Sequence, residues 1–138
     1  MEELVFDSWG LLAWLKNELP AADRVARIFA ASERRELLLA INIVNLGEVL
    51  NVATRLRGWD FAQAAVASFR AKIQVVSADD DLVMRAAAIK ARQRISYADA
   101  FAVATALDRR VPLVTGDPEL RALAGTLPAL RLEWLAAG

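Results

Sequence analysis

The chain has 138 residues, a length that usually forms one domain around one core. Its 17 basic and 17 acidic residues give a net charge of zero, so the overall charge does not point to a nucleic-acid or membrane partner. Hydrophobic residues make up 57% of the chain, above the roughly 45–50% typical of globular domains. We expect a single domain over residues 1–138, whose apolar excess fits an oligomer or partner interface, although a large internal core is the commoner reason.

Cysteine and histidine are both absent from the chain. The lack of cysteine excludes disulfides, zinc–thiolate sites and thiol nucleophiles. The lack of histidine removes the usual imidazole base and the commonest zinc ligand. An enzyme of this composition must use carboxylates, lysine, hydroxyl groups or a metal held by oxygen ligands.

The sequence has no feature of a membrane or secreted protein. No run of about 18 uncharged apolar residues occurs, so no transmembrane helix is expected. The first residues, Met1 to Phe6, are acidic and short, unlike the basic and then apolar start of a signal peptide. A cytoplasmic protein is the default expectation.

The first half of the chain alternates short apolar runs with helical patterns. Residues 4–6 are predicted as a strand, followed by a helix from about Gly10 that stops at Pro20. An amphipathic helix over residues 23–35 precedes a second strand over residues 37–43. Two helices follow, over residues 46–57 and 61–72, and Gly58 is the expected C-cap of the first.

The second half repeats the alternation. A third strand over residues 73–76 leads to helices over residues 79–92 and 96–108. A fourth strand over residues 111–114 leads to a short helix from Pro118 to about Gly125, and residues 130–134 are a candidate fifth strand. Apolar strands separated by helices indicate a parallel sheet with both faces covered, which is an α/β fold. Ligands of such sheets bind where the strands end and the helices begin.

Four acidic residues occupy such strand-to-helix corners. Asp7 directly follows the first strand, and Glu48 lies just inside the helix after the second. Asp99 lies near the start of the helix over residues 96–108, and Asp117 follows the fourth strand. Taken singly, each acid also fits a helix cap.

The capping interpretation has support for each acid. Asn45-x-x-Glu48 and Ser96-x-x-Asp99 both resemble a capping box, in which the acid returns to the backbone N–H of the cap. Asp117 precedes Pro118, as an N-cap before a proline at the first helical position would. Asp7 is able to cap the first helix or satisfy a turn.

The set is more informative than its members if the strands that precede Asp7, Glu48 and Asp117 are neighbours. Two carboxylates about 5 Å apart, at an effective dielectric constant near 20, repel by roughly 3 kcal/mol. Such groups must bind cations or hold protons at raised pKa values. Oxygen ligands suit Mg²⁺ or Mn²⁺, and metal-assisted phosphodiester hydrolysis fits a chain without histidine or cysteine.

Four segments together resemble the PIN-domain nucleases, and most closely the VapC toxins of bacterial and archaeal toxin–antitoxin pairs. The resemblance covers nearly the whole chain, and its four segments occur in the family's order. They are Val5-Phe6-Asp7-Ser8, residues 45–50 (Asn-Leu-Gly-Glu-Val-Leu), residues 95–106 around Ser96-Tyr97-Ala98-Asp99, and residues 113–120 around Thr115-Gly116-Asp117.

The resemblance implies a three-layer α/β/α fold with a five-stranded parallel sheet in the order 3-2-1-4-5. It also implies a Mg²⁺- or Mn²⁺-dependent endoribonuclease, with Asp7 and Asp99 as the main metal ligands and Glu48 and Asp117 completing the acidic pocket. Thr115 resembles a hydroxyl residue that orients Asp117 or a metal-bound water, and Ser8 has the same expected role beside Asp7. For both hydroxyls, simple turn hydrogen bonding is the alternative.

Trp9 departs from the family pattern, which usually has a small or hydroxylated residue after Asp-Ser. Its ring is either a surface for base stacking or core filling, and core filling is the preferred interpretation. Lys90, Arg92 and Arg94 precede Asp99 and are candidates for contacts with RNA phosphates, with a solvated helix end as the preferred alternative.

The resemblance also implies partners: an RNA substrate, a small VapB-like antitoxin and a second copy of the chain in a homodimer. The helical hairpin over residues 46–72 is the candidate surface for the two protein partners. Two alternatives stay open: a PIN-like nuclease of RNA processing that has no antitoxin, and a catalytically silent domain that binds RNA or protein.

Overall fold

A five-stranded parallel sheet forms the centre of the computed structural model, which describes residues 1–138. The strands pair in the order β3-β2-β1-β4-β5, and every pairing is parallel. Their bounds are β1 (Glu2–Phe6), β2 (Leu37–Asn42), β3 (Gln74–Val76), β4 (Leu113–Thr115) and β5 (Leu132–Trp134). The edge strands β3 and β5 have only three residues each.

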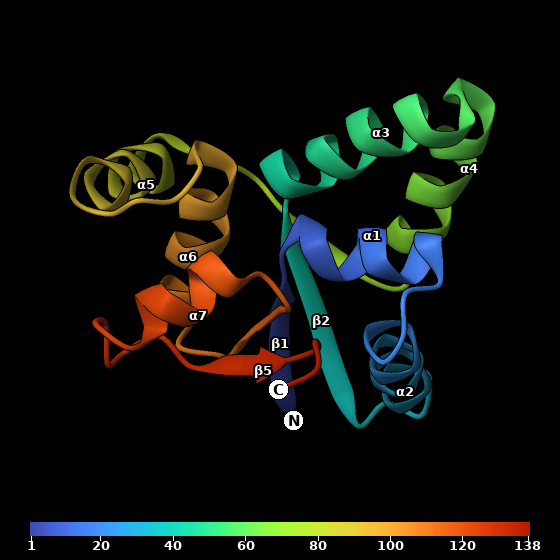
Figure 1. Ribbon diagram of the computed structural model, residues 1–138, viewed down its shortest axis with the longest axis horizontal. Coiled ribbons are helices and arrows are strands. Elements are labelled where there is room, and N and C mark those ends of the chain that lie inside the picture. Colours follow the sequence, from blue (N-terminus) through green and yellow to red (C-terminus); the bar gives the residue numbers. More distant parts are fainter.

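Seven helices cover the two faces of the sheet, as Figure 1 shows. Helices α1 to α4 lie on one side of the strands and α5 to α7 on the other. Their bounds are α1 (Ser8–Lys16), α2 (Ala21–Glu33), α3 (Ile43–Arg57), α4 (Trp59–Arg70), α5 (Asp80–Arg92), α6 (Tyr97–Arg109) and α7 (Pro118–Ala124). The predicted three-layer α/β/α fold and strand order are therefore confirmed.

The alternation of side chains along the strands divides the core into two halves. Leu4 and Phe6 of β1 pack with α1 to α4, whereas Val5 packs against α5 to α7. In β2, Leu39 and Ile41 face the first half and Ala40 the second. Because both faces are covered, the central strands are apolar at successive positions rather than at alternate ones.

Several helix boundaries differ from the sequence-based expectation. Helix α1 begins at Ser8 rather than near Gly10, because Asp7 is its N-cap. Helix α3 begins at Ile43 rather than Leu46, because the side chain of Asn42 accepts a hydrogen bond from the Val44 N–H at 2.9 Å. The link between α3 and α4 is Gly58 alone, at φ 92°, a backbone conformation that glycine adopts without strain.

None of the helices combines the length and the apolar character needed to cross a bilayer.

Candidate active site

Asp7 lies at the end of β1 and is completely buried. Its Oδ1 accepts a hydrogen bond from the Gly10 N–H at 3.1 Å, so the side chain caps α1 as one sequence interpretation proposed. Its Oδ2 is buried and has no hydrogen-bond partner. Burial raises the pKa of Asp7 to about 8, and the nearby Thr115 hydroxyl and Gly10 N–H offset only part of this effect.

Asp99 lies in the first turn of α6 and is only 8% exposed. Ser96 is the N-cap of this helix, and its Oγ accepts a hydrogen bond from the Asp99 N–H at 3.0 Å. The predicted cap at Ser96 is therefore confirmed. Burial, followed by the negative charge of Asp117, raises the pKa of Asp99 to about 6.

Asp117 follows β4 and is the N-cap of α7, with Pro118 at the first helical position. Its Oδ1 accepts a hydrogen bond from the Glu119 N–H at 2.9 Å, which confirms the predicted cap. The Asp117 N–H in turn donates to Oγ1 of the buried Thr115 at 3.0 Å. Thr115 thus fixes the backbone that orients Asp117, while its hydroxyl also lies near Asp7.

Glu48 lies in the second turn of α3 and is half-buried. Ser8, the first residue of α1, donates a hydrogen bond from its Oγ to Oε1 of Glu48. The structure therefore pairs Ser8 with Glu48 rather than with the neighbouring Asp7. This contact joins the start of α1 to α3 at the carboxyl edge of the sheet.

Asn45 connects two helices and does not cap α3, so the capping-box interpretation of this residue was wrong. The proposed capping box with Glu48 does not form, because the cap of α3 is Asn42 and Asn45 lies inside the helix. The buried side chain of Asn45 donates a hydrogen bond to the Ala98 carbonyl at 2.9 Å. It therefore connects the helix of Glu48 to the residue before Asp99. The only sequence signal for this contact is an asparagine three positions before an acid, and a capping box explains the same pattern equally well.

Trp9 packs directly against Gly116. A Cβ atom at residue 116 would overlap the six-membered ring of the Trp9 indole. The side chain is partly buried and lies against the core on the α1 to α4 side. This placement favours the core-filling interpretation of Trp9 and explains why glycine stands between Thr115 and Asp117.

The carboxylates lie within electrostatic range of one another. The charges of Asp99 and Asp117 both act to raise the pKa of Asp7, and those of Asp117, Glu48 and Glu119 act to raise that of Asp99. No group of three or more acidic side chains is placed closely enough to hold one metal ion. The structure thus brings the four residues to one edge without gathering them into a ready-made cage.

The donor set nevertheless fits a magnesium-like ion. Asp7 supplies a buried oxygen that has no hydrogen-bond partner, and the other candidate metal ligands near it are carboxylate and hydroxyl oxygens. Mg²⁺ keeps several water molecules and is commonly bound through one or two carboxylates together with substrate phosphates. A pair such as Asp7 and Asp99 meets that requirement without a third carboxylate.

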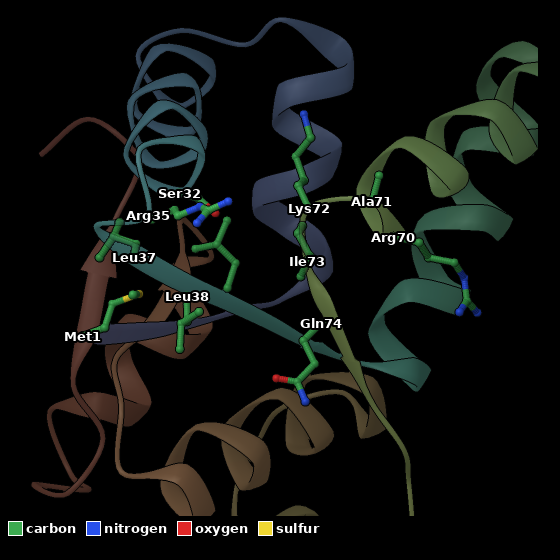
Figure 2. Close-up of a pocket in the computed structure, with 11 residues that line it drawn as sticks. Met1, Ser32, Arg35, Leu37, Leu38, Arg70, Ala71, Lys72, Ile73 and Gln74 are labelled. Carbon is green, nitrogen blue, oxygen red and sulfur yellow. The ribbon is translucent and has the colours of Figure 1, made fainter.

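A pocket at the amino ends of the strands, on the side of the sheet away from the four acids, is drawn in Figure 2. It has a volume of about 490 Å³ and is lined by the amino ends of β2 and β3 together with Met1, Arg35 and Arg70. None of the four acids lines it. Arg70 is the last residue of α4, where a cation complements the helix dipole, whereas Arg35 lies beyond the C-cap residue of α2, outside the helix.

Solved structures with this fold include several VapBC proteins. The chain superposes on VapBC2 from Rickettsia felis, described as bound to a promoter DNA fragment, with a TM-score of 0.73, 13% identity and coverage of 97% and 99% of the two chains. For DNA-bound VapBC from Salmonella typhimurium the values are 0.71, 17%, 99% and 100%. For VapC20 from Mycobacterium tuberculosis, described as a toxin that cleaves the sarcin–ricin loop, they are 0.69, 22%, 87% and 94%.

Sequence comparison gives two further results. No curated protein matches the chain. The family model described as the PIN domain matches residues 4–126, a segment that contains all four acidic residues and both hydroxyl residues of the candidate site. The chain therefore belongs to the PIN-domain family.

Proposed function

We propose that residues 1–138 act as one PIN domain, a Mg²⁺- or Mn²⁺-dependent endoribonuclease that is the toxin of a toxin–antitoxin pair. Asp7 and Asp99 are the main metal ligands in this proposal, with Glu48 and Asp117 in support. Ser8 and Thr115 act as positioning residues, because they contact Glu48 and the backbone of Asp117. Hydrolysis of cellular RNA would place the activity in the cytoplasm.

One observation supports this proposal above the others: a fully buried carboxylate with an unpartnered oxygen lies beside a second nearly buried carboxylate. An isolated ionised carboxylate is costly to bury, and a second negative charge nearby increases that cost. A helix cap requires neither the burial nor the second charge. A bound divalent cation compensates both.

In such a site some side chains bind the metal ion and others hold these ligands in position. A bound Mg²⁺ or Mn²⁺ ion would activate water and neutralise charge on the phosphodiester oxygens. The hydrogen bond from Gly10 holds one oxygen of Asp7 and leaves the other free for a ligand. Ser8 holds Glu48, and Asn45 fixes α3 to the start of α6, so that the supporting acids keep their positions relative to Asp99.

Metal binding is tested by thermal unfolding with and without millimolar Mn²⁺ or Mg²⁺. We expect the metal to raise the melting temperature of the wild type, because an ion that binds only the folded state stabilises it by mass action. Asp7→Asn and Asp99→Asn should lose most of this response. Asp79→Asn is the matched control, because Asp79 also caps a helix after a strand but caps α5, outside the candidate site.

Activity is tested with the same variants and a mixed-sequence single-stranded RNA. The wild type should cleave it with Mn²⁺ or Mg²⁺, and Asp7→Asn and Asp99→Asn should reduce the rate at least 100-fold while Asp79→Asn retains it. Expression of the wild type should arrest growth, and the two site variants should relieve the arrest. Binding of RNA without cleavage under every metal condition would establish the silent-domain alternative instead.

An antitoxin and a second copy of the chain are the proposed protein partners. The structural neighbours from Rickettsia felis and Salmonella typhimurium are described as VapBC assemblies, which supports a VapB-like partner. The hairpin of α3 and α4 exposes Leu56 and Trp59 at its tip, each about half accessible, and so offers apolar surface. Co-purification with the product of a neighbouring short reading frame tests the antitoxin, and light scattering of the purified chain tests the dimer. A nuclease without any such neighbour would indicate a role in RNA processing.

A further inference from the structure

A smaller pocket of about 270 Å³ lies between the α5–α6 loop and α7. Arg92, Gln93 and Arg94 line one wall of it, and Glu119 and Thr126 line the other. Glu119 is near enough to Asp99 to contribute to its raised pKa, so the pocket is adjacent to the candidate active site.

The two arginines of this pocket are free to bind a ligand. The ion pairs of the structure involve Lys16, Arg34, Arg85 and Arg109, and none involves Arg92 or Arg94. Both side chains are exposed, so a ligand can reach them without displacing a partner. Arg92 and Arg94 are therefore guanidinium groups without an ion-pair partner, close to the acidic residues of the candidate active site.

Helix stabilisation accounts for only one of the pair. Arg92 is the last residue of α5, where a cation complements the helix dipole. Arg94 lies beyond the C-cap residue Gln93, outside the helix, and still lines the same pocket. The shared pocket, rather than the helix end, is the feature that the two arginines have in common.

The lining indicates which part of a nucleic acid the pocket takes. It has no aromatic side chain on which a base could stack, because its remaining residues are Ile95, Ala122 and Leu123. Guanidinium groups bind phosphate oxygens in a bidentate manner, and phosphate contacts fix the position of a strand without reading its sequence. A polyanion also needs local cations to approach carboxylates in a chain of zero net charge.

We propose that Arg92 and Arg94 bind phosphates of the single-stranded RNA segment that flanks the cleaved bond, in the pocket between the α5–α6 loop and α7. This inference rests on the proposed nuclease function and adds a sequence-independent binding site to it. Arg92 and Arg94 are then substrate-binding residues that do not take part in the chemistry.

The test compares Arg92→Gln/Arg94→Gln with the wild type, using a fluorescent mixed-sequence 20-nucleotide RNA in EDTA between 50 and 200 mM KCl. Log affinity falls linearly with log salt, and each lost phosphate contact with a single strand lowers the steepness of this fall by about 0.7. Two lost contacts therefore lower it by about 1.4, so the wild type loses about sevenfold more affinity than the variant over this range. With Mn²⁺, KM should rise about tenfold at low salt while kcat stays within about twofold.

Arg35→Gln/Arg70→Gln is the control, because it removes the same charge from the pocket at the opposite edge of the sheet. It should leave the salt slope and KM unchanged. An unchanged slope and KM in Arg92→Gln/Arg94→Gln, or equal changes in both double variants, would overturn this inference and leave the nuclease function intact if the wild type cleaves. A wild type that neither binds nor cleaves RNA would overturn the proposed function, and this inference with it.

Discussion

The indole ring of Trp9 occupies the space that a side chain at Gly116 would need. Trp9 lies near the start of α1 and Gly116 lies between β4 and α7, so the contact joins the two corners that present Asp7 and Asp117. The glycine is required here by close approach rather than by an unusual backbone angle. The packing of a tryptophan thus constrains the position of an acidic residue 108 positions further along the chain.

Gly116→Ala tests this contact directly. The added methyl group must displace the Trp9 ring or the β4–α7 corner, so we expect a loss of about 1–3 kcal/mol in the free energy of unfolding. Trp9→Leu should remove much of that cost in the double variant, because the smaller side chain leaves room for the methyl group. Urea unfolding of the two single variants and the double variant gives the coupling.

Gly47→Ala is the matched glycine substitution. Gly47 lies inside α3, is exposed and has nothing within 4 Å of an added Cβ atom. Alanine should therefore stabilise the chain by roughly 0.5–1 kcal/mol through helix propensity. A similar loss of stability in both alanine variants would contradict a specific contact with Trp9.

Stability of the metal-free chain should fall as the pH rises from about 4 to 8. The pKa of Asp7 rises from 3.8 to about 8 on folding and that of Asp99 from 3.8 to about 6. The folded chain therefore binds more protons than the unfolded chain across this window, and its free energy of unfolding decreases as those protons are lost. Urea unfolding in EDTA at pH 5.5 and pH 8 should show a difference on the order of a few kcal/mol.

Asp7→Asn identifies the source of that pH dependence. Asparagine retains an oxygen for the Gly10 N–H but does not titrate, so the profile should be flatter between pH 6 and 8. Asp79→Asn should leave the profile like that of the wild type. If the profile of Asp7→Asn were unchanged, the buried carboxyl of Asp7 would not be the titrating group.

Asp99→Asn should be neutral or stabilising in the absence of metal. The substitution removes repulsion from Asp117 and Glu48 and the cost of burying a charge, while the Ser96 cap is preserved. Thermal unfolding in EDTA at pH 8, where the carboxyl is ionised in the wild type, gives the comparison. A clear loss of stability, together with no response to Mn²⁺, would favour a purely capping role for the acid.

Asn45→Ala should destabilise the chain and weaken its response to metal. The substitution leaves the Ala98 carbonyl without its side-chain donor, at an expected cost of about 1–3 kcal/mol. Because this bond joins α3 to the start of α6, its loss should also reduce the Mn²⁺-dependent rise in melting temperature. Asn51→Ala, at an exposed position of the same helix, should have little effect on either measurement.

The architecture was predictable from sequence because it depends on local patterns. Apolar strands such as β2, separated by helical patterns, identify a covered parallel sheet, although the predicted strand over residues 37–43 ends one residue earlier, at Asn42. Pro118 after Asp117 identifies the start of α7. Helix starts were less predictable where two candidate caps are close together. Asn42 and Asn45 are equally good caps by residue type, and only the extended backbone at Asn42 (φ −70°, ψ 143°) decides between them.

The residues of the candidate site were predictable, but several contacts among them were not. Asp7, Glu48 and Asp117 stand out because they come after strands that end at one edge of the sheet, and Asp99 because it lies in the first turn of an apolar helix. The partner of Ser8 is Glu48, 40 residues away, rather than the adjacent Asp7. The bond of Asn45 to Ala98 and the packing of Trp9 on Gly116 likewise depend on the angles between helices, which no local pattern specifies.

The short edge strands have a consequence for self-association. A chain that is 57% hydrophobic is at risk of aggregation if a sheet edge leaves a long row of free backbone groups. Here the sheet ends on both sides in strands of three residues, β3 and β5, which give an incoming strand few hydrogen-bonding positions. The apolar composition is thus accommodated by helices packed on both faces of the sheet, while growth of the sheet itself is limited at each side.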